Sequence, residues 1–213
     1  MEIYKNESIE INLKNNEYIM SIKNINEYKN YYKALGNILN IKSIKNKMIL
    51  NQSNMVSLSK YMKDVVIEDV NLLFKNMKLI LEGLEKDGKC IYLLDMNDFM
   101  VIKKDNMNII LWLNVDKSVE LKGDNMIIDF PFSKGNKYLS PELKKIEKIP
   151  NTISKKSIYY SLGLLMLNMI NKFDRVENIN VNNHIEMINN SKLYFSLLRC
   201  LEIDEEDRYY LWI

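Results

Sequence analysis

Four charged residues could take part in phosphate chemistry: Lys23, Asp95, Asp98 and Asp129. A lysine ammonium group binds phosphate, and aspartate carboxylates bind a hard cation such as Mg²⁺, which takes oxygen ligands. If the three carboxylates and the lysine converge on one pocket, the chain can hold a nucleotide and its metal ion. The alternative is that the carboxylates lie scattered over turns, where they face water and bind nothing. The elements that position these residues decide between the two.

Zinc and disulfide chemistry find little support in this sequence. It contains two cysteines, Cys90 and Cys200, and a single histidine, His184. The cysteines do not have the spacing of metal ligands, and both lie among apolar residues. We therefore expect two buried, reduced thiols, with neither a zinc site nor a disulfide framework.

The composition is that of an ordinary globular protein, with 47% hydrophobic and 27% charged residues and a formal net charge of +2. This charge argues against a strongly basic nucleic-acid binder. The start, MEIYKNESIE, lacks the apolar core of a signal peptide, and no apolar run reaches the roughly 18 residues that a membrane span needs. We expect a cytoplasmic protein without a membrane span. Asn, Ile and Lys dominate, as they do in proteins from AT-rich genomes, including viral ones.

Alternating apolar residues predict strands in the first part of the chain. Ile9, Ile11 and Leu13 fall on one face of a strand, and further strands are expected over YIMSIKNI, KNKMILNQ and NMVSLSKYM. Between them, INEYKNYYKALGNILNI has apolar residues three and four positions apart, which is typical of a helix. Three tyrosines of this helix are expected to pack in the interior, the alternative being a binding face: Tyr28, Tyr31 and Tyr32.

The remainder of the chain is predicted to be mainly helical. VNLLFKNMKLILEGLEKDG reads as a long amphipathic helix that stops at Gly88. Short strands follow in CIYLL, in FMVIKKDNMNIILWL with a turn at KKDN, and in SVELKGDNMIIDF with a turn at KGDN. From Ile158 onward, helical patterns dominate in SIYYSLGLLMLNMINKF and SKLYFSLLRCLEI.

Three short segments occur in an informative order: KYLSPEL (137–143), SIYYSLG (157–163) and RCLEIDEEDR (199–208). Together they resemble protein kinases. The first resembles the "APE" end of the activation segment, with Pro141 and Glu142 matching. The second resembles the "D-x-Y-S-L-G" start of the central helix of the large lobe, with Gly163 matching. The third resembles the late "C-L-x-x-D-P-x-x-R" pattern, with Arg208 matching, so the resemblance covers roughly residues 18–213.

The resemblance implies an α+β, kinase-like bilobal fold. Residues 1–63 would form a reduced, strand-rich small lobe, and residues 64–213 a mainly helical large lobe that is truncated after Arg208. The resemblance also implies a largely buried salt bridge between Glu142 and Arg208, because kinases pair these two positions. Removing one partner of such a pair costs roughly 3–5 kcal/mol.

The parts of a kinase that hold the nucleotide are missing. The Gly-rich loop is absent, since the first glycine of the chain is Gly36, inside the predicted helix. IMSIK resembles the "VAIK" strand and makes Lys23 a candidate phosphate ligand. The following helix has no glutamate to hold this lysine, and Glu27 is too close to it in the chain to serve.

The catalytic positions are also replaced. CIYLLDMNDFMVI stands where kinases have the catalytic loop, which puts Leu93 at the catalytic aspartate and Asp98 at the metal-binding asparagine. The "DFG" aspartate becomes Trp112 or Leu113, and neither can bind a cation. Asp129 in IIDFPF mimics "DFG", but it stands too close to the "APE" motif for an ordinary activation segment.

The structural motifs of a kinase are retained while its nucleotide-binding and catalytic positions are replaced. This combination predicts a pseudokinase, a catalytically inactive kinase-like protein that acts by binding another protein. It would have no catalytic residue, cofactor or metal ion, and it would modulate signalling, in the host cell if the protein is viral. The resemblance implies a kinase or a kinase substrate as the partner. Two alternatives stay open: an atypical nucleotide-binding kinase rebuilt on Lys23 and the three aspartates, and an unrelated α+β adaptor. The placement of Glu142 and Arg208 distinguishes the adaptor from the others.

Overall fold

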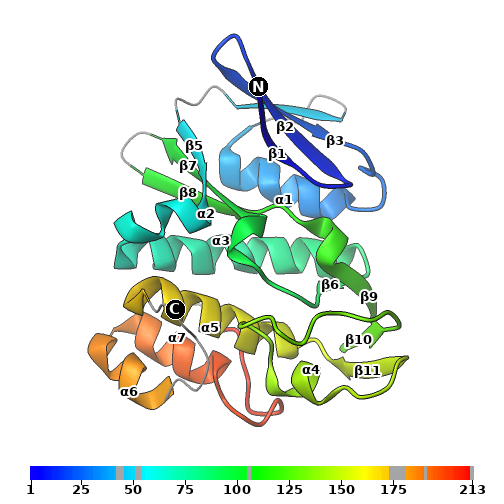
Figure 1. Cartoon of the computed structure of the whole chain (residues 1–213), viewed down its shortest axis with the longest axis vertical. Helices are drawn as coiled ribbons and strands as arrows, with labels where there is room; N and C mark the ends of the chain where they lie inside the picture. The colour runs from blue at the N-terminus through cyan, green and yellow to red at the C-terminus, as the bar shows by residue number, and fades with distance from the viewer. Residues whose placement is uncertain (42–45, 51–53, 105–106, 173–180, 190, 212–213) are drawn as a thin grey trace.

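The computed structural model describes residues 1–41, 46–50, 54–104, 107–172, 181–189 and 191–211. Within these ranges the fold is α+β, with three antiparallel sheets, seven α-helices and short 3-10 helices. The expected class is therefore correct. Figure 1 shows the N-terminal strands and α1 above the long helix α3 (Ile67–Lys86), and the C-terminal helices below it.

The first sheet has four strands in the order β1 (Glu2–Lys5), β2 (Ile9–Lys14), β3 (Glu17–Ile22) and β4 (Lys47–Leu50). Ile11 pairs with Met20 across β2 and β3, and both side chains are fully buried because alternate residues of a strand face the interior. The turn between these strands holds Asn15 and Asn16 at φ values of 50° and 64°. Asparagine tolerates this left-handed conformation, which tight hairpins require.

Helix α1 (Lys29–Leu39) is fixed in place by α3. A Cβ atom at Gly83 of α3 would lie 2.9 Å from the backbone oxygen of Asn30, so the glycine permits a close helix–helix approach. Asp87, which follows α3, accepts hydrogen bonds from the backbone amides of Asn30 at 3.0 Å and Tyr31 at 2.9 Å. These amides have no partner within α1, so the Asp87 carboxylate acts as the cap of its first turn.

Two further sheets follow. One has the order β5 (Asn54–Ser57), β7 (Phe99–Lys104) and β8 (Met107–Trp112), and the other the order β11 (Asn151–Ser154), β10 (Asn125–Ile128), β9 (Ser118–Lys122) and β6 (Lys89–Ile91). The side chain of Asn76 in α3 donates to the carbonyl oxygen of Ile110 in β8 at 3.2 Å, which ties the helix to the sheet. Gly123 occupies the predicted β9–β10 turn with a φ of 61°, which favours glycine.

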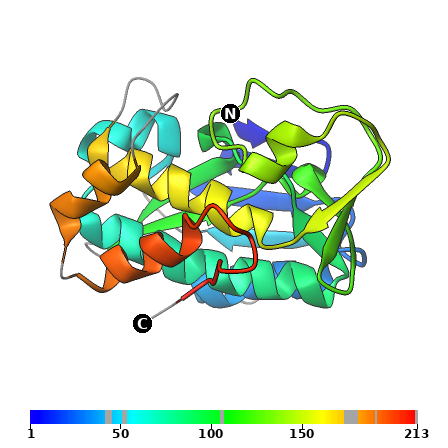
Figure 2. The same ribbon diagram turned by 90° about the horizontal axis from the view of Figure 1, so that it is seen from below.

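The remaining helices are α2 (Leu58–Tyr61), α4 (Pro141–Lys145), α5 (Ser157–Asn171), α6 (Val181–Ile185) and α7 (Lys192–Cys200). Four 3-10 helices complete the described elements: Met62–Asp64, Met96–Asp98, Val115–Lys117 and Glu186–Ile188. Figure 2 shows α5, in yellow, running across this face of the molecule, with α7 packed beside it. Gly163 permits this packing, because a Cβ atom there would lie 2.9 Å from Cγ of Leu201.

The sequence-based boundaries need two corrections. The predicted strand NMVSLSKYM is a strand only over β5, because Leu58 and Tyr61 have helical spacing and both are buried in α2. The short elements α4 and β11 were not predicted. The predicted turn at KKDN (103–106) includes residues 105–106, which lie outside the described ranges, so it stays a prediction.

The buried apolar side chains form one continuous cluster that includes Leu35 of α1, Ile80 of α3 and Leu165 of α5. The boundary between residues 1–63 and 64–213 stays a prediction, since packing of α1 on α3 and pairing of β5 with β7 join the two ranges. Cys90 and Cys200 are buried, free thiols, as expected. Among the helices of the described ranges, none is both long enough and apolar enough to cross a membrane.

Candidate functional site

Three segments that are far apart in the sequence meet at one point of the fold. They are the β1–β2 turn at residues 6–8, the 3-10 helix η3 (Val115–Lys117) with Asn114 before it, and Asp98 at the end of the 3-10 helix η2 (Met96–Asp98). We call this meeting point the junction. It contains Asp98, one of the four candidate residues, and it is where polar side chains from different elements come together.

Asn6 shapes the β1–β2 turn and attaches it to the strand end of β8. Its side-chain oxygen accepts hydrogen bonds from the backbone amides of Ser8 at 3.0 Å and Ile9 at 2.6 Å, which is the local turn that asparagine favours. Its side-chain nitrogen donates to the carbonyl oxygen of Leu113 at 3.2 Å and to Oδ1 of Asn114 at 3.4 Å. The side chain therefore bridges two segments more than a hundred residues apart.

Asp116 holds the turn from the other side. Its Oδ2 accepts a hydrogen bond from the backbone amide of Glu7 at 3.0 Å, and its Oδ1 accepts one from the hydroxyl group of Ser8 at 2.5 Å. These are direct contacts between the turn and η3. A ligand cannot lie between the two segments unless it breaks these hydrogen bonds, so the junction is closed here.

Asp98 is only 5% exposed, and both of its carboxylate oxygens have partners. Oδ1 accepts a hydrogen bond from the side chain of Asn114, and Oδ2 one from the ammonium group of Lys117, each at 2.7 Å. Burial raises the pKa of Asp98 above its ordinary value, and the hydrogen bonds from Lys117 and Asn114 offset this rise only in part. Lys117 thus supplies the positive charge that a metal ion would otherwise bring.

Two of the three tyrosines, Tyr28 just before α1 and Tyr31 within it, support the junction from within the core. The hydroxyl group of Tyr31 donates to the carbonyl oxygen of Trp112 at 2.8 Å, and that of Tyr28 to the carbonyl oxygen of Val115 at 3.4 Å. Tyr28, Tyr31 and Tyr32 are all buried, with edge-to-face ring contacts. The prediction that they pack in the interior is confirmed.

The four charged candidates do not converge. Lys23 is exposed and follows β3; its backbone amide donates to the carbonyl oxygen of Ser8 at 2.9 Å, while its ammonium group makes no polar contact with any described residue. Glu27 pairs with Lys89 at 2.9 Å and not with Lys23.

Asp95 and Asp129 also lie outside the junction. Asp95 caps η2 by accepting a hydrogen bond from the backbone amide of Asn97 at 2.9 Å, and Asp129 is exposed just after β10. Across the residues that the structure describes, no group of three or more His, Cys, Asp or Glu side chains could hold a metal ion.

The sequence put Trp112 or Leu113 at the "DFG" aspartate position, and both side chains are fully buried in the core. Asn114 is the residue that contacts Asp98. Sequence reasoning missed Asn114, Asp116 and Lys117, which follow a buried strand as the run NVDK. The available signal was this polar run together with the turn-forming Asn-x-Ser at residues 6–8.

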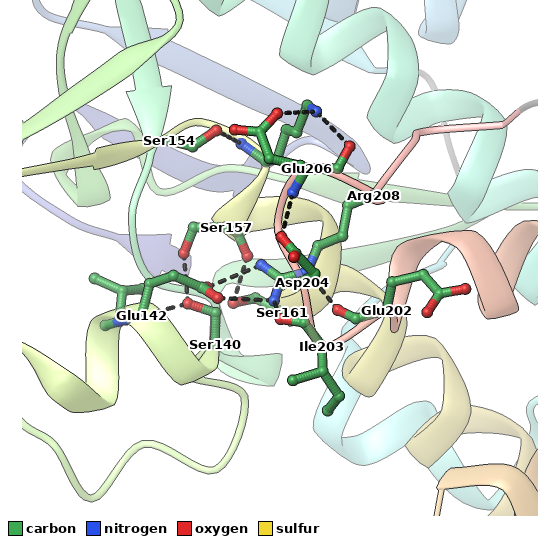
Figure 3. A network of polar contacts seen from close by, with 12 residues as sticks. Ser140, Glu142, Ser154, Ser157, Ser161, Glu202, Ile203, Asp204, Glu206 and Arg208 are labelled. Carbon is green, nitrogen blue, oxygen red and sulfur yellow. Dashed lines mark hydrogen bonds and ion pairs between the residues drawn. The ribbon is translucent and has the colours of Figure 1, made fainter.

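A second polar cluster lies between α4 and the segment after α7, and Figure 3 shows its members as sticks. Arg208, with no exposed surface, donates two hydrogen bonds of 2.8 Å to the two carboxylate oxygens of Glu142. It also donates to the carbonyl oxygens of Glu202 at 2.6 Å and Ile203 at 2.7 Å. The ring of Tyr160 lies 4.9 Å from the guanidinium carbon.

This ion pair is built for stability. Burial alone would raise the pKa of Glu142, but the hydrogen bonds and the charge of Arg208 outweigh it and hold the pKa below its ordinary value. Ser140 is the N-cap of α4, accepting from the amide of Leu143 at 3.3 Å, and its hydroxyl group lies 2.5 Å from that of Ser157 in α5. Both charges are satisfied by protein groups, so the cluster fastens α4 to the C-terminal segment.

No protein-family model matches the chain, and no curated protein matches it either. The geometry of the junction and of the Glu142–Arg208 pair must therefore carry the functional argument.

Proposed function

We propose that the chain is a catalytically inactive, kinase-like protein that acts by binding another protein. The observation that carries the proposal is the direct hydrogen bonding of Glu7 and Ser8 to Asp116. In a protein kinase the loop between the first two strands covers the phosphates of the nucleotide, and the "DFG" aspartate, which aligns here with Trp112 or Leu113 a few residues before Asp116, holds magnesium. In this protein the β1–β2 turn is hydrogen-bonded directly to the segment that contains Asp116.

The surroundings of Asp98 support the absence of phosphoryl transfer. In the kinase-like alignment this residue stands at a metal-binding position, and Leu93 stands at the catalytic base. A leucine cannot accept a proton, and the ammonium group of Lys117 already neutralises Asp98 at 2.7 Å. A metal ion would have to displace Lys117 and lose the hydrogen bond from Asn114 as well.

The kinase-like part of the proposal draws on the second cluster. The two residues matched to the "APE" glutamate and the late arginine, Glu142 and Arg208, form a buried bidentate ion pair. Gly163, matched to the central helix, lies against Leu201. These contacts favour the kinase-like reading over an unrelated adaptor, in which the two charges would have no reason to meet 66 positions apart.

The test is a thermal-shift titration of the purified chain with ATP, with and without Mg²⁺ or Mn²⁺. A ligand at a hundredfold excess over its dissociation constant stabilises the folded state by about 2.7 kcal/mol. We expect no metal-dependent change in melting temperature for the wild type. We also expect no metal-dependent change in melting temperature for Asp116→Ala. In this variant the β1–β2 turn loses its hydrogen bonds to Asp116, but the ammonium group of Lys117 still pairs with the Asp98 carboxylate. An active kinase serves as the positive control.

One result would overturn the proposal: a rise in melting temperature that needs the metal ion and disappears in Asp98→Asn. Such a result would favour the atypical nucleotide-binding kinase, and transfer of labelled phosphate from ATP would then be measured. The partner-binding half of the proposal has its own test, given with the surface inferred below.

A further inference from the structure

A groove of about 790 Å³ lies along α1 and is lined by this helix and by the segments just before and just after it. Buried or half-buried residues form the apolar part of its floor: Ile25, Tyr32, Gly36 and Ile41. Three polar residues also line the groove: Asn26, Asn30 and Asn37. Its size falls within the range of sites that bind ligands or peptide side chains, roughly 300–1,000 Å³. The apolar part of the floor offers an anchor point for an apolar side chain of another molecule.

The groove carries positive charge that the protein does not neutralise. Lys29 and Lys33 are exposed, lie one helical turn apart and line the groove. Neither forms an ion pair with any described residue, and no acidic side chain is among those that line the groove. The nearest acid in the sequence, Glu27, is paired with Lys89 at 2.9 Å.

Lys29 is the first residue of α1, at the positive end of the helix dipole, where a lysine is unfavourable. The Asp87 carboxylate already caps this end through the amides of residues 30 and 31 and the side chain of Asn30. The positive charge left for an acidic partner is therefore that of Lys29 and Lys33.

The groove is also preformed. α1 is held by the Asp87 cap and by the close contact of Asn30 with Gly83. At Gly36 a Cβ atom would lie 3.1 Å from the carbonyl oxygen of Ile41, so the glycine lets the chain after α1 fold back and close one side of the floor. A rigid surface loses little conformational entropy when a partner binds.

We infer that this groove is the docking surface for an acidic segment of a partner protein. The segment places an aliphatic or aromatic side chain on the floor formed by Tyr32, Gly36 and Ile41, and carboxylates beside Lys29 and Lys33. The inference rests on the proposed function, since it names the surface through which the inactive protein works. Two lysines beside an apolar floor suit an acidic peptide better than a nucleic acid, whose backbone needs a long track of cations.

The test is a selection of random peptides displayed on phage against the immobilised full chain. Enriched peptides are synthesised with a fluorescent label, and their binding is measured by anisotropy. We expect Asp or Glu next to Leu, Ile or Phe in the enriched sequences, and affinity that falls as salt is raised. The double variant Lys29→Glu/Lys33→Glu should weaken binding at least about tenfold, whereas Lys29→Arg/Lys33→Arg should retain it.

The matched control is Lys144→Glu/Lys145→Glu, which reverses two exposed lysines in the last turn of α4 and should leave the affinity unchanged. Melting temperatures verify that each variant is folded. Failure to enrich any peptide, or enrichment of peptides without acidic residues, overturns the inference.

Two further outcomes separate the inference from the proposed function. Peptides that bind the wild type and Lys29→Glu/Lys33→Glu equally well would place the binding surface elsewhere and leave the proposed function standing. A single-stranded RNA that binds through the two lysines more tightly than any selected peptide would make this a nucleic-acid site. A metal-dependent ATP shift, in contrast, would defeat the proposed function itself.

Discussion

Two carboxylates, the buried Asp98 in the junction and the half-buried Glu142 in the helical part, each lie beside a cation, yet their pKa values move in opposite directions. The pKa of Asp98 is raised, whereas that of Glu142 is lowered. Burial raises the pKa of both, and Asp98 is the more deeply buried of the two. The cations differ as well, because Lys117 offers one contact at 2.7 Å and Arg208 offers two parallel contacts at 2.8 Å.

The comparison shows what each region is built to do. Carbonyl oxygens of Glu202 and Ile203 fix the guanidinium group of Arg208 before it meets Glu142, so the pair gains from its geometry. Lys117 is partly exposed and its flexible ammonium group has no second acceptor among the described residues. The Glu142–Arg208 pair stabilises the fold, while the Asp98–Lys117 pair mainly provides the buried Asp98 carboxylate with a counter-charge.

Removing Arg208 should have the largest effect. Arg208→Met leaves the half-buried Glu142 without its partner and removes every hydrogen bond of the guanidinium group, so we expect the free energy of unfolding to fall by about 3–5 kcal/mol. Urea denaturation followed by circular dichroism measures this loss. Arg199→Met is the control, because Arg199 makes only an exposed contact of 3.8 Å with Glu202 and should change stability by no more than about 0.5 kcal/mol. A small loss for Arg208→Met would contradict the contrast between the two pairs.

Removing Lys117 should lower the free energy of unfolding by less than removing Arg208 does. Lys117→Met deprives Asp98 of its charge partner, and we expect a loss of about 1–3 kcal/mol at neutral pH. The loss should shrink as the pH falls, because the buried carboxylate can then take up a proton. Adding Asp98→Asn to this variant should restore most of the stability, since no buried charge remains. The same denaturation series measures all three proteins, and a double variant no better than Lys117→Met would speak against the account of Asp98.

The smallest effect is a pair of opposite pH dependences. Glu142 has a lowered folded pKa, so its stabilisation is present above its unfolded value of about 4.5 and is lost as the pH falls through the folded value. Asp98 has a raised folded pKa, so its contribution is present below its unfolded value of about 3.8 and is lost as the pH rises through the folded value.

Melting temperatures measured as a function of pH should show these dependences in two variants. The difference in melting temperature between the wild type and Glu142→Gln should decrease as the pH falls. The melting temperature of Asp98→Asn should increase relative to that of the wild type as the pH rises. Parallel curves for the two variants would remove the distinction between the two carboxylates.

Local patterns predicted much of the fold. The alternation around Ile11 and the helical spacing of Tyr28, Tyr31 and Leu35 follow from burial of one face, and both elements form where the sequence indicates. Glu142 and Arg208 could be paired because their segments resemble motifs with a known relation. The helix α2 was missed, since its four residues are too few for a periodic signal.

The junction could not be predicted in the same way. Asn6, Ser8 and Asp116 stand in turns, where polar residues normally face water, and nothing local marks the contact between positions more than a hundred residues apart. Their meeting depends on how the β1–β2 turn and η3 are brought together by the packing of α1 on α3. For the same reason Asp129 could be proposed as a metal ligand from its sequence, although it is exposed after β10.

Amide hydrogen exchange of Glu7, measured by NMR with and without Mg²⁺ and ATP, tests the closed junction most directly. The Glu7 amide donates to Asp116 at 3.0 Å, so we predict slow exchange that Mg²⁺ and ATP leave unchanged and that becomes fast in Asp116→Ala. Fast exchange in the wild type, or exchange that slows when Mg²⁺ and ATP are added, would contradict the account and indicate a turn that opens to receive a nucleotide.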